Sequence, residues 1–185
     1  MKDRLWCVDL FRCESITLKS HWVLVVVDQF TRRIIGFAAH AGDVDGVTLC
    51  RMFNHIIAGR TPPRYLSSDH DPLFEYPRWQ ANLRIVDIDK IKTVPYAPVS
   101  HPFVERLIGT TRREFLDHIL FWNVVDLDRK LLEFQDHYNQ DRVHASLRGD
   151  ASVKAAGEVT TKRANIDNFR WRSHCRGLVE LPLAA

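Results

Sequence analysis

The hydrophobic and polar positions of the first forty residues predict three β-strands. Residues 5–10 are apolar apart from Asp9, residues 22–27 form a continuous apolar run, and residues 34–39 follow a polar turn at residues 31–33. A continuous run of this kind suits a strand that is buried on both faces of a sheet. Because the connections are short, we expect the three strands to form an antiparallel meander.

The following pattern predicts a helix and two more strands. A helix begins near Asp43 or Asp45, either of which can cap it, and runs to Gly59 before two prolines prevent its continuation. Its apolar stripe is expected to contain Val47, Cys50, Phe53 and Ile57. Strands are then expected over residues 64–68 and 91–94, with a short helical stretch over residues 76–83 between them.

Two helices are expected in the second half of the chain. Ser100 can cap a helix that has Pro102 in its first turn and continues through Phe115 toward Leu120. An amphipathic helix begins at Asp126, and its buried face is expected to contain Leu127, Leu131, Phe134 and Tyr138. Residues 151–164 are small and polar and suit a linker, whereas residues 169–171 and 178–183 can add a strand or dock on the core. We therefore predict a core over residues 1–150 and a C-terminal linker and tail over residues 151–185.

Composition narrows the class of protein. With 185 residues, 45% hydrophobic and 26% charged, the chain has the size and balance of one soluble globular domain. It contains no apolar run of about 18 residues and no apolar stretch at its start, so we expect a cytoplasmic protein without a membrane partner. The four cysteines lack the spacing of a disulfide framework or a cysteine-based zinc module. A net charge of +3 permits a nucleic-acid partner without requiring one.

Three acids are the candidate catalytic residues: Asp9 at the end of the first apolar stretch, Asp69 after the fourth predicted strand, and Glu105 just inside a predicted helix. The 35 residues between Asp69 and Glu105 match the gap between the last two acids of phosphoryl-transfer enzymes with an Asp, Asp, Glu triad. Magnesium prefers oxygen ligands, and two ions about 3.5–4 Å apart can promote an in-line displacement at phosphorus.

Each acid also has a simpler interpretation. Asp9 can be an exposed acid at a strand end, although its apolar neighbours favour a ligand. Asp69 lies in a sequence with good turn chemistry, where Asp71 is the rival ligand. Glu105 would be stabilised by the helix dipole regardless of function. His70 and His101 flank two of the acids and can bind metal or DNA, or be ordinary loop residues.

Basic residues follow Glu105 along the same predicted helix. Arg112 is seven residues further on and shares its face, with Gly109 between them, and this combination suits the close approach of a phosphate backbone. We also expect Arg106 and Arg113 to contact phosphates, although Arg113 can equally belong to a solvated surface.

The sequence resembles the catalytic core of insertion-sequence transposases and retroviral-type integrases. The likeness rests on residues 6–9, 25–36 and 67–69, on Glu105 with Arg112, and on residues 138–147, which resemble the Tyr-Asn-x-x-Arg-x-His-x-Ser-Leu segment of bacterial members. It covers roughly residues 5–150, and the set of motifs in this order is highly specific. Arg142 and His144 are the basic residues of the last segment, and the resemblance marks them as DNA contacts.

The resemblance implies an α/β fold of the ribonuclease H-like type, with a five-stranded mixed sheet flanked by helices. It implies that Asp9, Asp69 and Glu105 are catalytic and bind two Mg²⁺ or Mn²⁺ ions. It also implies the reaction: water releases a 3′-hydroxyl at the end of a mobile element, and that hydroxyl attacks a target DNA strand. The expected partners are element ends, target DNA and further copies of the chain, since two DNA ends must be joined.

The sequence departs from the family pattern at several positions. Asp71 replaces a glycine that many relatives have two residues after the second acid, and residues 101–102 replace an Asn-Gly ahead of the glutamate. Relatives generally have a helix-turn-helix region before the core, whereas Met1 stands only eight residues before Asp9. Two alternatives stay open: a nuclease of the same fold that cuts RNA–DNA hybrids, and a catalytically silent remnant that only binds DNA or a partner transposase subunit.

Overall fold

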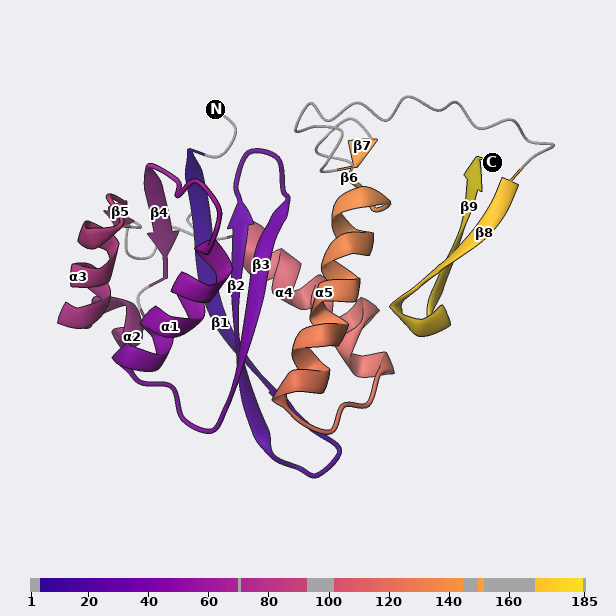
Figure 1. The fold of residues 1–185 in the computed structure, drawn as a ribbon, viewed down its shortest axis with the longest axis horizontal. Helices are drawn as coiled ribbons and strands as arrows, with labels where there is room; N and C mark the ends of the chain where they lie inside the picture. Colours follow the sequence, from indigo (N-terminus) through magenta and orange to yellow (C-terminus); the bar gives the residue numbers. More distant parts are fainter. Residues whose placement is uncertain (1–3, 70, 93–101, 145–149, 152–168, 185) are drawn as a thin grey trace.

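A five-stranded mixed sheet forms the centre of the molecule (Figure 1). The computed structural model describes residues 4–69, 71–92, 102–144, 150–151 and 169–184. The sheet has the order β3-β2-β1-β4-β5 and contains β1 (Leu5–Glu14), β2 (Ser20–Asp28), β3 (Ile34–Ala41), β4 (Tyr65–Ser68) and β5 (Asp89–Lys92). The first three strands pair antiparallel, whereas β4 pairs parallel with both β1 and β5. The predicted sheet is confirmed, although β5 begins two residues before the predicted strand.

Three helices cover one face of the sheet: α1 (Gly46–Ile57), α2 (Pro72–Glu75) and α3 (Pro77–Ile85). Asp45 caps α1 as predicted, because its side chain accepts a 2.7 Å hydrogen bond from the backbone nitrogen of Thr48. The buried face of α1 differs from the predicted stripe, since Val47 and Cys50 are only half-buried. The side chains that it buries instead, together with Phe53 and Ile57, are Leu49, Met52 and Ile56.

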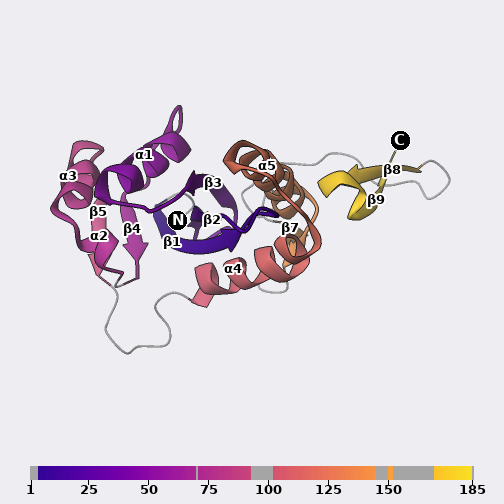
Figure 2. The same cartoon turned by 90° about the horizontal axis from the view of Figure 1, so that it is seen from below.

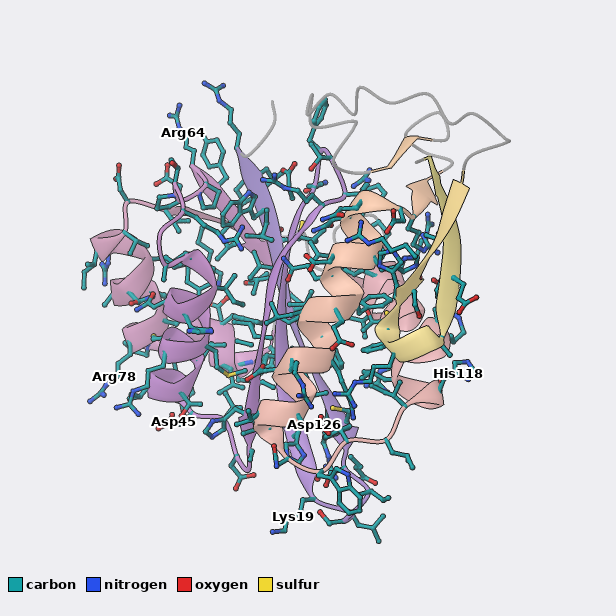
Figure 3. The ribbon with its side chains drawn as sticks, turned by 45° about the vertical axis from the view of Figure 1, so that its right-hand side comes forward. Lys19, Asp45, Arg64, Arg78, His118 and Asp126 are labelled. Carbon is teal, nitrogen blue, oxygen red and sulfur yellow. The ribbon has the colours of Figure 1, made fainter. Side chains whose placement is uncertain are left out.

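The opposite face of the sheet is covered by α4 (Pro102–Glu114), the short 3₁₀ helix η1 (Leu116–His118) and α5 (Val124–Gln140). The helix α4 ends before the predicted Leu120, because Phe115 leaves helical geometry and stacks its buried ring on Phe134, with 5.1 Å between ring centroids. Asn123 caps α5, whose first residue, Val124, lies two residues before the expected start at Asp126. Figure 3 shows Asp126 in the first turn of this helix. The four residues predicted for its buried face are all buried.

The C-terminal segments form a separate hairpin rather than an extension of the central sheet. Its strands are β8 (Phe169–His174) and β9 (Val179–Ala184), which pair antiparallel around the 3₁₀ helix η3 (Cys175–Gly177). The hairpin lies beyond α5 (Figure 1), and buried Cys175 joins the core between the sheet and α5. A further two-stranded pair joins β6 (Val143–His144) to β7 (Asp150–Ala151). The predicted boundary at residue 150 stays a prediction.

The arrangement of α4 across β1 positions the candidate site. Figure 2 shows β1 between α1 and α4, and the two faces of the strand belong to different core clusters. Trp6 and Val8 pack toward α1, whereas Cys7 and Phe11 pack with Val104 and other residues of the α4 and α5 side. In the part of the chain that the structure describes, none of the helices combines the length and apolar character needed to cross a membrane.

Candidate active site

Asp9 lies in the middle of β1, the central strand of the sheet. Side chains alternate between the two faces of a strand, so Asp9 shares the face of Cys7 and Phe11, which is the face covered by α4. The carboxyl is half-buried, and its Oδ1 accepts a 2.7 Å hydrogen bond from the backbone nitrogen of Leu10. Asp9 is therefore an acid inside the longest strand, not at its end as the sequence pattern indicated.

The parallel pairing of β1 with β4 brings Asp69 to Asp9. Val8 pairs with Ser68, so the next residue on each chain segment is an aspartate, and both carry their side chains on the same face if the alternation continues. Asp69 Oδ1 accepts a 3.1 Å hydrogen bond from the backbone nitrogen of Asp71, which is the turn chemistry expected from the sequence.

Asp71, the rival ligand, has a structural role of its own. Its Oδ1 accepts a 2.8 Å hydrogen bond from the backbone nitrogen of Leu73 and thereby caps α2. Each of the two aspartates has one oxygen engaged by a backbone nitrogen, so the choice of Asp69 rests on its place directly after Ser68, the strand partner of Val8. His70 and His101 lie outside the described residues.

Glu105 comes from the first turn of α4. Its neighbours Val104 and Leu107 are buried against the sheet, which fixes the helix over β1 and leaves Glu105 exposed. The helix start is also held by Arg32 of the β2–β3 turn, whose guanidinium lies over the ring of Phe103 at 3.1 Å from the centroid. This anchor was missed from the sequence, where nothing linked the two residues.

Electrostatics show that the acids share one neighbourhood. The pKa of Asp9 is raised from 3.8 to about 7, first by burial and then by the negative charge of Asp69. The Leu10 hydrogen bond opposes the shift, and the charges of Glu105 and Asp71 add to it. The fold therefore brings together the three acids that sequence reasoning selected, with Asp71 beside them.

Carboxylate oxygens are ligands that Mg²⁺ prefers, and each of two ions about 3.5–4 Å apart needs only one or two of them, since water and phosphate oxygens complete its shell. The uncompensated negative charge around Asp9 also fits a divalent cation.

The basic face of α4 differs in detail from the sequence expectation. Arg112 is exposed, and its Nη2 donates a 2.9 Å hydrogen bond to the backbone oxygen of Arg12 while its guanidinium lies 5.6 Å from the Phe11 ring centroid. The space above Gly109 is occupied, because Nη1 of Arg113 lies 3.1 Å from where a Cβ would stand. The glycine thus accommodates an arginine, and the predicted phosphate contacts of Arg112 and Arg113 stay predictions.

The remaining predicted DNA contacts lie around the ends of α4 and α5. Arg106 is exposed, and its positive charge makes a small contribution to the pKa values of Arg32 and Tyr138, lowering both. Arg142 donates to both carboxylate oxygens of Glu114, from Nε at 3.1 Å and from Nη2 at 2.8 Å. His144 belongs to β6, and its side chain lies outside the described ones. Of this group, Arg142 has a definite structural role in linking the two helix ends.

Two sequence comparisons relate the chain to known proteins. Residues 86–151 match the integrase core domain family. A 39.2 kDa uncharacterized protein of insertion element IS476 from Xanthomonas euvesicatoria is 26% identical over 165 residues, which are 89% of this chain and 47% of the relative. The chain thus spans about half the length of the curated relative that it matches.

Solved structures show the same fold. A chain of the simian T-cell lymphotropic virus intasome superposes with a TM-score of 0.69 at 17% identity, over 92% of this chain and 62% of that chain. The HTLV-2 integrase catalytic core domain, solved in complex with magnesium, gives 0.62 at 16% identity over 82% of this chain and 94% of that chain. The BIV integrase catalytic core domain gives 0.57 at 19% identity over 82% of this chain and 92% of that chain.

The central sheet with its flanking helices is therefore ribonuclease H-like, as predicted. The family match over residues 86–151 and the insertion-element relative support the resemblance inferred from the sequence motifs: this chain is similar to catalytic cores of the integrase and transposase type.

Proposed function

We propose that the protein catalyses metal-dependent cleavage and strand transfer of DNA, with Asp9, Asp69 and Glu105 as its catalytic acids. The observation that carries the proposal is the parallel register of β1 and β4, in which Val8 pairs with Ser68 and Asp9 and Asp69 follow side by side. The pKa of Asp9, raised to about 7 by burial and then by the charges of Asp69 and Glu105, supports it. Acids that are distant in sequence and crowd together at a cost in free energy mark functional sites. The integrase core match over residues 86–151 includes Glu105 and supports the same reaction class.

Mg²⁺ or Mn²⁺ is the cofactor of this proposal, and the carboxylates of Asp9, Asp69 and Glu105 would hold two ions. Bound ions of this kind activate the attacking oxygen and stabilise the leaving oxygen of a phosphodiester displacement. The charges of both Asp69 and Glu105 act on Asp9, which suits Asp9 as a ligand shared between the two ions. The magnesium complex of the HTLV-2 integrase core supports this choice of ion.

The reaction consists of two phosphodiester transfers at one site. In the first, water attacks a phosphodiester at the element end, the P–O3′ bond breaks, and a free 3′-hydroxyl is released. In the second, that 3′-hydroxyl attacks a phosphodiester of the target strand, whose own P–O3′ bond breaks. The protein's contribution is positioning and charge: Asp9, Asp69 and Glu105 would hold the ions, which would supply charge stabilisation at the reacting phosphate, and Arg106, Arg112 and Arg113 contact the neighbouring backbone.

The partners of the proposal are DNA and further copies of the chain. The similar structures include an intasome and HTLV-2 integrase cores in dimeric and trimeric forms. Since strand transfer joins two element ends to one target, an active assembly needs at least two copies. Because the chain spans about half of its insertion-element relative, the proposal covers the reaction and not the choice of element ends or target sequences.

A nuclease acting on RNA–DNA hybrids is the second candidate, and Asp71 is the observation that favours it. Such enzymes usually have a fourth acid, and the charge of Asp71 contributes to the raised pKa of Asp9. The cap of α2 provides a separate explanation for Asp71. Cleavage of a hybrid but not of duplex DNA would favour this second function.

The test is manganese-dependent nicking and joining of labelled duplex DNA. We expect activity in the unaltered chain and a loss of at least about 100-fold in Asp69→Asn, since a metal ligand is neutralised. Asp71→Asn is the matched control, because an amide oxygen can still cap α2. Equal activity in the unaltered chain and in Asp69→Asn, or no activity on any DNA substrate in either ion, would reject the proposal.

A further inference from the structure

A second group of possible ligands lies where the C-terminal hairpin meets α5. His137 and Asp141 are one turn apart near the end of α5, with 3.8 Å between His137 Nδ1 and Asp141 Oδ2. His174, at the end of β8, brings its Nε2 to 3.0 Å from the same oxygen. The three residues offer ligand atoms that all lie within 4.8 Å of one another.

These three atoms are buried and lack hydrogen-bond partners. Nδ1 of His137, Oδ2 of Asp141 and Nε2 of His174 are all solvent-inaccessible, and in the part of the chain that the structure describes none has a hydrogen bond of acceptable geometry, the 3.0 Å contact between Nε2 and Oδ2 included. The His174 side chain is only 6% exposed. Buried polar atoms are normally satisfied, so three unsatisfied atoms directed at one another require an explanation.

We propose that His137, Asp141 and His174 bind a zinc ion. Zinc takes imidazole nitrogens and carboxylate oxygens at about 2.0–2.2 Å in tetrahedral geometry, which places neighbouring ligand atoms about 3.3 Å apart. The observed separations of 3.0 Å and 3.8 Å lie on either side of that value, so small side-chain rotations form the site. The fourth position belongs to water.

The ligand atoms of this second group favour a different ion from the Mg²⁺ proposed for the three catalytic acids. Two imidazole nitrogens suit zinc and other transition metals, whereas Mg²⁺ requires oxygen ligands and retains water. The zinc group also uses none of the residues assigned to the proposed DNA reaction. Either proposal can therefore fail without affecting the other.

The consequence of zinc binding is attachment of the hairpin to the core. Without the ion, the ion pairs that link Arg176 of η3 to α5 are long, at 3.7 Å to Asp126 and 3.9 Å to Glu133. Long, exposed ion pairs contribute little stability. An ion ligated by α5 and β8 together would hold the two elements in one arrangement, since a preformed site cannot exist when the hairpin is undocked.

The experiment is zinc titration of the chelator-treated full chain, followed by calorimetry and thermal unfolding. We expect one equivalent of zinc to bind and the melting temperature to rise by about 5–10 °C at a zinc concentration 100-fold above the Kd. His174→Ala and Asp141→Ala should lose both effects. X-ray absorption of the zinc complex should show nitrogen and oxygen ligands, including imidazole, and no sulfur.

Two control variants separate this site from other zinc binding. His118→Ala removes an exposed imidazole that Figure 3 shows on the hairpin side of the molecule, and it should bind zinc normally. Asp69→Asn should also bind normally, since it alters only the acid site. Circular dichroism checks that each variant folds, and His137→Gln serves if His174→Ala does not. The proposal is overturned if the unaltered chain gains no stability from zinc, if the ligand variants gain as much, or if the ion has sulfur ligands.

Discussion

Val8 of β1 and Ser68 of β4 face each other in a parallel register, and the residue after each of them is an aspartate. This single pairing brings Asp9 and Asp69 together across 59 intervening residues. Two neighbouring carboxylates in a half-buried setting repel each other, and the raised pKa of Asp9 reflects that repulsion together with burial. The sheet therefore holds an unfavourable arrangement that a cation can relieve.

The first prediction concerns the stability of the metal-free protein. The folded-state pKa of Asp9 is raised from 3.8 to about 7, so its contribution to stability is present below about pH 4 and is lost as the pH rises to about 7. We expect the unaltered chain to lose on the order of 2–4 kcal/mol over this range, after allowance for solvent screening at a partly exposed carboxyl. Asp9→Asn should remove this loss. Urea unfolding in chelator at pH 4 and pH 8 measures it.

Magnesium supplies the control for that measurement. At pH 8 the ion should stabilise the unaltered chain by occupying the ionised acids, whereas Asp9→Asn should respond weakly. If both proteins have the same pH dependence and the same response to magnesium, Asp9 is not the group that senses the neighbouring acids.

The second prediction concerns Arg106, which is exposed on α4 close to Glu105. If its side chain neutralises one DNA phosphate, Arg106→Gln should weaken DNA binding similarly for all sequences and reduce the slope of log K against log salt by about 1. Fluorescence anisotropy over a range of salt concentrations measures the slope. Arg84→Gln changes an exposed arginine of α3, on the opposite face of the sheet, and should leave the slope unchanged. Equal slopes in both variants would exclude a phosphate contact by Arg106.

Much of the fold was predictable because its signals are local. The apolar runs of the three antiparallel strands and the 3.6-residue spacing of Leu127, Leu131 and Phe134 depend only on neighbouring residues. The end of α4 was not predictable, since Phe115 leaves the helix to stack on Phe134 nineteen positions away. Tertiary packing overrode the helical pattern there.

Of the two candidate sites, one was predictable from the sequence and the other was not. Asp9, Asp69 and Glu105 could be selected because their order and spacing match a known motif. His137, Asp141 and His174 were missed, although His137 and Asp141 have the one-turn spacing of helical ligand pairs. Their third member comes from the hairpin, and only its docking on α5 shows that the three residues meet.

The third prediction tests the packing of α1 on β3. A Cβ added to Gly36 would stand 2.8 Å from Cγ2 of Ile56, closer than atoms can approach without a shift. Gly36→Ala should therefore destabilise the protein by about 1–3 kcal/mol, as measured by urea unfolding. Ile56→Ala opens the space, so the double variant should be less destabilised than the sum of the single changes. Additive effects would show that Ile56 is not the obstructing neighbour.

The fourth prediction concerns the pair between Arg142 and Glu114, which joins the ends of α5 and α4. The hydrogen bond and charge of Arg142 lower the pKa of Glu114, so the stability from this pair is present above the ordinary glutamate pKa of 4.5 and is lost as the pH falls through the lower folded value. Because both side chains are partly exposed, we expect a coupling of about 0.5–1 kcal/mol. A double-variant cycle with Glu114→Gln and Arg142→Gln at pH 7 measures it, and the coupling should vanish in acid.

The same pair determines whether Arg142 can contact DNA. Its guanidinium donates to both oxygens of Glu114, so a phosphate must compete with a carboxylate that is already in place. Glu114→Gln weakens that competition, and DNA should then bind more tightly, by about 2- to 5-fold at low salt, if Arg142 reaches the backbone. The gain should disappear when Arg142→Gln is added, because the freed group is then absent. A gain that persists in the double variant would come from the removal of a negative charge alone, and Arg142 would then be a structural link between α4 and α5.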